Sequence, residues 1–115
     1  GYARLPYIDY IEPILSACAP VFTKSGKGLE CKVEVQNFGQ VGSKKALVEV
    51  AYKKEGKTIK VASGMVPALK PYEKTDILLS AKDVVEEGKE YDLIVTLYSG
   101  KKVLSTFNLK KKVLE

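Results

Sequence analysis

Hydrophobic and polar residues alternate along several short segments of the chain, which is the pattern of β-strands with one buried face. The alternation is clearest in residues 29–36, where Leu, Cys and Val alternate with Glu, Lys and Gln. The same period recurs in residues 46–53, 58–62, 75–79, 91–97 and 103–109. In no segment of about a dozen residues do the apolar positions follow the helical spacing without interruption. The pattern therefore predicts an all-β protein.

Turn residues separate the predicted strands at intervals typical of a β-sandwich. Gly56 and Gly100 each lie between two alternating segments and predict hairpins. The first 28 residues instead carry Pro6, Pro13 and Pro20, and they predict an edge segment because proline cannot donate a hydrogen bond inside a sheet. We therefore expect a single domain over residues 1–115, an immunoglobulin-like β-sandwich of about seven antiparallel strands. Residues 1–28 would form its N-terminal edge segment and residues 29–109 its core.

Residues 87–98 give the sandwich prediction a specific feature. Gly88 is followed three residues later by Tyr91, at the start of the strongest alternating segment. In immunoglobulin-like folds, a tyrosine near the start of such a strand returns its hydroxyl to backbone a few residues upstream. Tyr91 is therefore predicted to form a structural tyrosine corner.

The length and composition fit one independent domain. A chain of 115 residues buries roughly 65% of the surface that its unfolded form exposes. No apolar run approaches the ~20 residues that a membrane helix needs, and Gly1 in place of a starting methionine indicates a chain cut from a longer protein. We therefore expect membrane association only through an anchor outside this chain. The abundance of Lys, Glu and Val resembles the surface of a thermophile's protein.

The formal net charge of +5 raises the question of nucleic-acid binding. The lysines are spread over turns and strand ends, at positions 44, 45, 53, 54, 57, 60, 101, 102 and 110–112. Arg4 is the only arginine in the sequence, although base readout and bidentate phosphate contacts favour arginine. Lysines beside strands more often prevent sheet edges from pairing with other molecules. The charge pattern therefore predicts no nucleic-acid partner.

The residue types restrict the chemistry that the chain could perform. The sequence contains no histidine, which excludes serine triads, cysteine–histidine pairs and the common zinc sites. The acidic residues Asp83, Glu86, Glu87, Glu90 and Asp92 lack the spacing of a calcium loop. We interpret them as a solvated corner, and we expect no catalytic residue, no metal and no cofactor.

Two cysteines flank a predicted hairpin loop over residues 23–28. The loop would place Cys18 and Cys31 nearly opposite each other. A disulfide between them would contribute roughly 3 kcal/mol in the chain-entropy estimate, and it would favour an exported protein or a hyperthermophile's cytosol. The alternative is a pair of buried free thiols that act as small hydrophobic residues. The sequence favours neither alternative.

Aromatic residues are concentrated in the N-terminal segment, at Tyr2, Tyr7, Tyr10 and Phe22. Because aromatic side chains are enriched in interface cores, one interpretation is that Tyr2, Tyr7 and Tyr10 contact a partner or a second copy of the chain. The other interpretation, which we favour, is that these rings cover the open end of the sandwich.

Four short motifs occur in order along the chain: Val33-x-Val35-x-Asn37-x-Gly39, Val48-x-Val50-x-Tyr52, Leu69-x-Pro71 and Glu87-Gly88-x-x-Tyr91. Together they are similar to the CARDB family, whose members are fibronectin-like sandwich modules named for cell-adhesion-related proteins and common on bacterial and archaeal surfaces. The resemblance covers roughly residues 29–109. It implies a non-enzymatic module, exposed outside the cell.

These observations lead us to expect an interaction or spacer module of a larger cell-surface or envelope-anchored prokaryotic protein. Such a module would serve adhesion or assembly and would bind another protein or a second copy of itself. One alternative is a soluble domain of an archaellum accessory protein, which also places a β-sandwich after a membrane anchor. Another is a carbohydrate-binding module, which would expose a row of aromatic residues on one sheet face.

Overall fold

The computed structural model describes residues 12–114 except positions 27 and 83, and this part of the chain contains strands and no helix. Its eight strands are β1 (Leu15–Ala17), β2 (Val21–Ser25), β3 (Gly28–Asn37), β4 (Ala46–Lys54), β5 (Lys57–Val66), β6 (Lys74–Lys82), β7 (Glu90–Ser99) and β8 (Lys102–Lys112). The predicted all-β class is confirmed. It follows that no described helix is long and apolar enough to cross a membrane.

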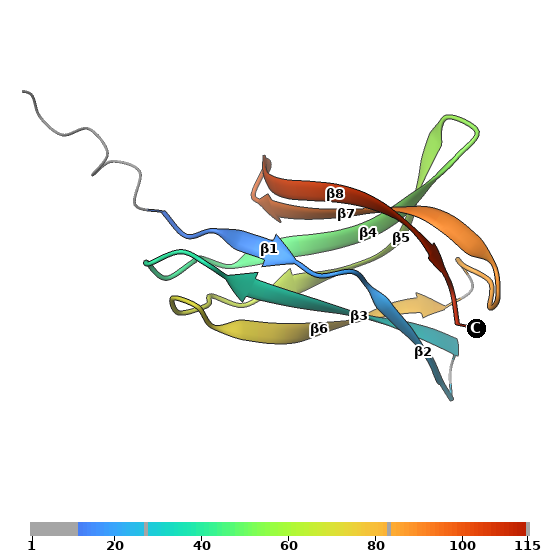
Figure 1. Cartoon of the computed structure of the whole chain (residues 1–115), viewed down its shortest axis with the longest axis horizontal. Helices are drawn as coiled ribbons and strands as arrows, with labels where there is room; N and C mark the ends of the chain where they lie inside the picture. Colours follow the sequence, from blue (N-terminus) through green and yellow to red (C-terminus); the bar gives the residue numbers. More distant parts are fainter. Residues whose placement is uncertain (1–11, 27, 83, 115) are drawn as a thin grey trace, which may run out of the picture.

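The strands form two antiparallel sheets that pack face to face as a sandwich (Figure 1). Sheet A has β3 at its centre, with β6 on one side and both β1 and β2 on the other. Sheet B has the order β5-β4-β7-β8. The predicted immunoglobulin-like sandwich is therefore confirmed as an architecture.

The alternating segments place their apolar residues between the sheets. Val33 and Val35 of β3 are completely buried, as are Leu93 and Leu97 of β7. Burying a side chain of this kind contributes about 1.5–3 kcal/mol relative to leaving it exposed. Leu15, Phe22 and Val113 also join the core, so that the buried cluster extends beyond the range 29–109.

The edge of sheet A explains why the described chain has eight strands and not about seven. β1 pairs with the end of β3, with Ala17 opposite Val35, while β2 pairs with its beginning. Between them, the Cys18 backbone N–H donates to the Glu34 carbonyl at 2.8 Å. Pro20 has no N–H to donate, so the ladder stops there and resumes at Val21. The predicted proline-marked edge strand is present, but it is divided in two.

The expectation that Cys18 lies opposite Cys31 is wrong. β2 continues to Ser25, so the loop is shorter than predicted, and the register places Phe22 opposite Cys31. Cys18 instead bonds to Glu34, three residues or about 10 Å along β3, beyond the usual Cα separation of a disulfide. Cys18 is exposed, Cys31 is buried, and both thiols are free.

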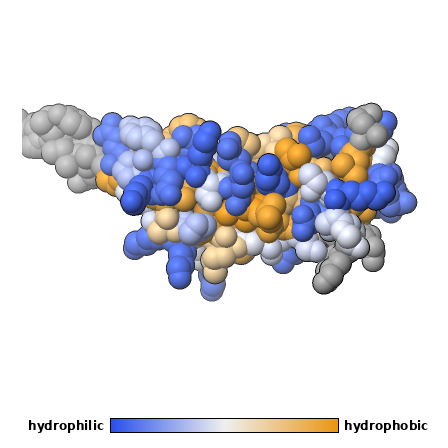
Figure 2. All heavy atoms as spheres, turned by 90° about the horizontal axis from the view of Figure 1, so that it is seen from below, coloured by the Kyte–Doolittle hydropathy of each residue, from blue (hydrophilic) through white to orange (hydrophobic). Residues whose placement is uncertain are grey.

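Seen from the side of β6, β3 and β2, the molecule is covered by hydrophilic side chains along its whole length, with hydrophobic atoms between them (Figure 2). The outward positions of β3 are Glu30, Lys32, Glu34 and Gln36. The outer face of sheet A is therefore polar along β3, while Val21 and Leu78, which pair with Lys32 from its two sides, are exposed apolar residues.

Candidate interaction surface

Four apolar or aromatic side chains form a row across the outer face of sheet B. Leu47 of β4 pairs with Met65 of β5 on one side and with Tyr98 of β7 on the other. Tyr98 in turn pairs with Val103 of β8. Directly opposed residues on antiparallel strands share one face and lie about 5 Å apart. We call this row, Met65–Leu47–Tyr98–Val103, the apolar band.

The apolar band is open to solvent. Met65 is 63% exposed and Val103 is 52% exposed, while Leu47 lies at 37%. The next row along the sheet is polar: Glu49 faces outward, and the hydroxyl oxygens of Thr96 and Thr106 are 3.2 Å apart. The exposed large hydrophobic residues of sheet B thus all lie at one end of it, at Leu47, Met65, Val103 and Leu104.

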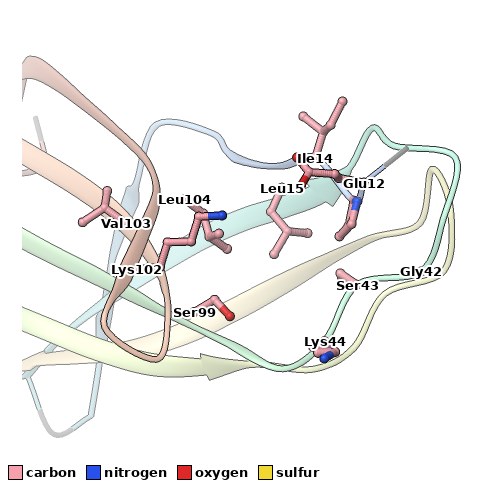
Figure 3. Close-up of a pocket in the computed structure, with 11 residues that line it drawn as sticks. Glu12, Ile14, Leu15, Gly42, Ser43, Lys44, Ser99, Lys102, Val103 and Leu104 are labelled. Atoms are coloured by element: carbon pink, nitrogen blue, oxygen red, sulfur yellow. The ribbon is translucent and has the colours of Figure 1, made fainter. Parts of the chain in front are cut away.

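A groove of about 480 Å³ adjoins the band where β8 approaches β1 (Figure 3). Ile14 and Leu15 line it from one side and Val103 and Leu104 from the other. Leu104 occupies a β-bulge, because Leu97 pairs with Ser105 while Tyr98 pairs with Val103. Bulges redirect side chains at sheet edges. The groove also carries polar groups from Glu12, Ser43, Lys44, Ser99 and Lys102.

Asn37 fixes the position of the chain that lines this groove. Its Oδ1 accepts hydrogen bonds from the backbone N–H groups of Ile14 at 3.1 Å and Gly39 at 2.9 Å. Its Nδ2 donates to the carbonyls of Val41 at 2.8 Å and Leu69 at 3.3 Å. One buried side chain therefore holds the start of β1 and two loops together. The Asn-x-Gly pattern marked a strand end in the sequence, but not this role.

Gly39 permits the close approach of the N-terminal chain. A Cβ atom at this position would lie 2.5 Å from the Glu12 carbonyl oxygen and 2.8 Å from the Ile14 nitrogen. Both are backbone atoms, which cannot move aside as a flexible side chain can. Glycine at this position therefore keeps Ile14 in contact with the loop after β3.

The hydroxyl of Tyr91 accepts a hydrogen bond from the backbone N–H of Glu86 at 2.8 Å. The tyrosine ring is buried and packs edge-on against Tyr52, with ring centroids 4.7 Å apart. The Lys89 ammonium lies 5.7 Å from the ring centroid. This arrangement connects the link before β7 to the strand itself and places Tyr91 in the structural framework.

The acidic corner before β7 is solvated. Glu87 forms an ion pair with Lys24 at 3.0 Å, and Glu86 forms one with Lys89 at 3.5 Å. In both pairs at least one partner is more than half exposed. Ion pairs of this kind contribute little to stability. Among the described residues, no three His, Cys, Asp or Glu side chains come together as metal ligands.

The two thiols differ in their environments. Burial raises the pKa of Cys31 to about 12, although the charge of Lys111 acts in the opposite direction. The pKa of Cys18 is also raised, first by partial burial and then by its hydrogen bond to Glu34. The Cys18 Sγ lies 3.4 Å from Glu34 Oε1. Neither thiol is activated as a nucleophile, because activation requires a lowered pKa.

The predicted partner-contact residues Tyr2, Tyr7 and Tyr10 lie outside the described residues. Phe22, from the same aromatic group, is buried in the core at 4% exposure. The apolar band itself was not identified from the sequence. Its signal was a large apolar residue, Leu47, on the face of β4 that also carries Glu49, Ala51 and Lys53.

No protein-family model matches the chain, and no curated protein does. Solved structures with similar folds include the β-glucosidase DesR from Streptomyces venezuelae, with 13% identity and a TM-score of 0.51 over 85% of this chain. A GH3 β-glucosidase from Bifidobacterium adolescentis gives 17% identity and a TM-score of 0.49 over 85%. β-Glucosidase 3B from Thermotoga neapolitana gives 15% and 0.47 over 90%.

The likeness concerns a small part of much larger proteins. The match covers 15% of the Streptomyces chain, 17% of the Bifidobacterium chain and 16% of the Thermotoga chain. At 13% identity, the Streptomyces match supports the sandwich fold alone. The chain therefore has the architecture of a module that also occurs as one part of a larger enzyme.

Proposed function

We propose that this chain is a non-enzymatic interaction module of a larger cell-surface or envelope-anchored protein, serving adhesion or assembly. The observation that carries the proposal is the apolar band across all four strands of sheet B. Contiguous apolar patches mark contact sites more often than isolated exposed residues do. The β-sandwich is the rigid support on which this surface is displayed.

The charges around the band indicate what kind of partner it fits. Lys44 and Lys45 precede β4 beside Leu47, while Lys101 lies in the turn before β8 and Lys102 begins β8 beside Val103. All four side chains are exposed. A partner with an apolar centre and an acidic rim would complement this surface, because opposed potentials favour encounter and suppress wrong pairings.

The CARDB-like motifs support the cell-surface location and the adhesion or assembly role in this proposal. A carbohydrate-binding role is less favoured, since the band contains one aromatic residue, Tyr98, and not the row that a sugar-binding face would present.

The proposal can be tested by thiol labelling in the organism that makes the protein. In a Cys18→Ser background, Met65→Cys reports on the band and Leu78→Cys reports on the outer face of sheet A. The two positions are matched, with exposed fractions of 63% and 66%. Both variants should react with a membrane-impermeant maleimide at the same rate when the protein is purified.

On intact cells, Leu78→Cys should be labelled, and Met65→Cys should be labelled about fivefold more slowly if four-fifths of the molecules are bound to the partner. Equal rates for both positions on cells would contradict the interaction surface. Labelling of Leu78→Cys only after permeabilisation would contradict the surface location, while the ratio of the two rates would still test the band.

A further inference from the structure

The outer edge of sheet B is a long strand with no described strand paired to its outer side, although its first residues contact β1. β8 spans 11 residues and, within the described chain, pairs with β7 alone. On the opposite edge of the sandwich, β5 and β6 lie against each other. On the near edge, sheet A ends in the short β1 and β2, interrupted at Pro20. Natural proteins protect edges in these ways, and β8 has neither short length nor proline. Its protection consists of the lysines at its two ends and the bulge at Leu104, which leave residues 105–109 without such a device.

The inward side chains of β8 are incompletely covered. Phe107 and Leu109 pair with Val95 and Leu93, which are buried, yet they are themselves only partly buried. Ala17 of β1 is also partly buried against the core. The core is thus incompletely covered on the side between β8 and the divided edge strand of sheet A.

The charges at the two ends of β8 have the same sign. Residues 103–109 carry no charge, while Lys101 and Lys102 precede them and Lys110, Lys111 and Lys112 follow. Antiparallel pairing of β8 with the β8 of a second copy would bring the lysines of one end opposite those of the other. Like charges directly opposed across strands are destabilising. The edge therefore disfavours its own copy and fits a strand with carboxylates at both ends.

We propose that the outer edge of β8, over residues 103–109, binds an extended segment of a partner protein, which adds to sheet B as a fifth strand and has apolar side chains between acidic ends. In this mode, backbone hydrogen bonds supply affinity and pockets for alternate side chains supply specificity. All strand pairs in both sheets are antiparallel, so the added strand runs opposite to β8. Its C-terminal part then reaches the groove beside Leu104.

The groove completes the recognition. Ile14, Leu15 and Leu104 form an apolar wall for one large side chain, and the charged residues at the same groove are Lys44, Lys102 and Glu12, two cations and one anion. An aromatic residue near the C-terminal end of the segment fits the wall, and the carboxylates after it fit the lysines. The inference goes beyond the proposed function, because it concerns the edge of sheet B and not its outer face.

The probe is a ten-residue peptide with alternating valine and threonine at its centre, phenylalanine near its C-terminus and two glutamates at each end. A control peptide carries lysines at both ends. NMR titration of the whole chain measures the dissociation constant, and amide hydrogen exchange shows where the peptide lies. We expect the glutamate peptide to bind at least about tenfold more tightly than the lysine peptide. Amides within residues 105–109 should gain protection.

Two charge-reversal variants separate the edge from the overall charge. Lys101→Glu with Lys110→Glu should weaken binding of the glutamate peptide about tenfold. Lys32→Glu with Lys60→Glu changes the net charge equally on strands away from β8, and should leave binding within about twofold at 0.15 M salt, where distant charges are screened. Ile14→Ser should weaken binding of the glutamate peptide. It should leave unchanged the binding of a glutamate peptide that has alanine in place of phenylalanine.

Several results would overturn the proposal. They are the absence of binding at millimolar glutamate peptide, equal binding of both peptides, binding without protection of β8 amides, or equal losses in both charge-reversal variants. A stable dimer of the chain alone, with β8 amides protected at its interface, would also overturn it, since the edge would then accept its own copy. These results do not depend on the labelling rate at Met65→Cys, so this proposal and the proposed function can fail separately.

Discussion

Asn37 shows how one polar residue can organise the functional end of the molecule. It has no exposed surface, and its amide oxygen and nitrogen are bonded to buried or partly buried backbone groups that would otherwise lack these partners. A buried donor or acceptor that loses its partner costs about 1–3 kcal/mol. The hydrogen-bonded side chain of Asn37 therefore contributes more to stability than an apolar residue of the same size would at this position.

We expect Asn37→Ala to lower the free energy of unfolding by about 3 kcal/mol, because it leaves the N–H of Ile14 and the carbonyl of Val41 without partners. Urea unfolding of both forms measures the change. Gln36→Ala is the control, since Gln36 also bonds across to a loop, through Nε2 to the Tyr72 carbonyl at 3.0 Å, but in an exposed position. Equal midpoints for Asn37→Ala and the parent would show that Asn37 does not hold these segments.

A second prediction at the residue scale concerns how the free energy of unfolding depends on pH through Cys31. Its pKa is about 12 in the folded protein and about 8.5 in an unfolded chain. The unfolded state therefore releases the proton first as pH rises. The stability that Cys31 contributes is complete below about pH 8.5 and is lost up to the folded pKa, by at most about 1.4 kcal/mol per pH unit.

Urea midpoints at pH 7 and pH 10 test this expectation. Between these values the parent should lose about 2 kcal/mol more than Cys31→Ala, because alanine has no proton to release. Cys18→Ser serves as the comparison: the pKa of Cys18 is raised as well, but its thiol is exposed, so this change should reduce the parent's pH-dependent loss of stability less than Cys31→Ala does. If Cys31→Ala loses as much stability as the parent, the buried thiol is not the group that titrates.

At the scale of elements, the sequence predicted most of the strands because their two faces differ. The segment that became β3 alternates strictly, and those that became β4 and β7 alternate with exceptions at Leu47, Ala51 and Ile94; each has one buried face in the structure. The divided edge strand was less predictable. Prolines indicated an edge, but whether the ladder resumes after Pro20 depends on the backbone of β3 beside it. The predicted placement of Cys18 opposite Cys31 was wrong for the same reason, because the length of a loop alone does not determine which residues of two strands pair.

The tyrosine corner joins two elements and gives a prediction at this scale. Tyr91→Phe should lower stability by about 1 kcal/mol, the net value of one hydrogen bond, because the Glu86 N–H loses its acceptor. Partner binding at the far end of sheet B should not change. Guanidinium melts of Tyr91→Phe and of Tyr98→Phe, whose ring lies on the outer face, provide the comparison. If Tyr98→Phe loses as much stability as Tyr91→Phe, the hydrogen bond of Tyr91 to Glu86 has no particular stabilising role.

At the scale of the whole molecule, the candidate surface exists only after the strands are paired. Met65, Leu47, Tyr98 and Val103 come from four strands, and each alone is an unremarkable exposed residue. The register brings them into one row. Sequence patterns report which face a residue occupies but not which residues are neighbours across strands. The fold was therefore predictable from alternation, whereas the band and the groove were not.

At the same scale, we expect the chain to have no glycosidase activity of its own. Glycosidases usually place two carboxyl groups about 5–9.5 Å apart across the scissile bond. Of the described residues that line the groove, Glu12 alone is acidic, and Lys44 and Lys102 are basic. We expect the purified chain to hydrolyse 4-nitrophenyl β-glucoside no faster than buffer does. Hydrolysis that Glu12→Gln abolishes would contradict a non-enzymatic module, whereas hydrolysis that survives Glu12→Gln would point to a contaminating enzyme.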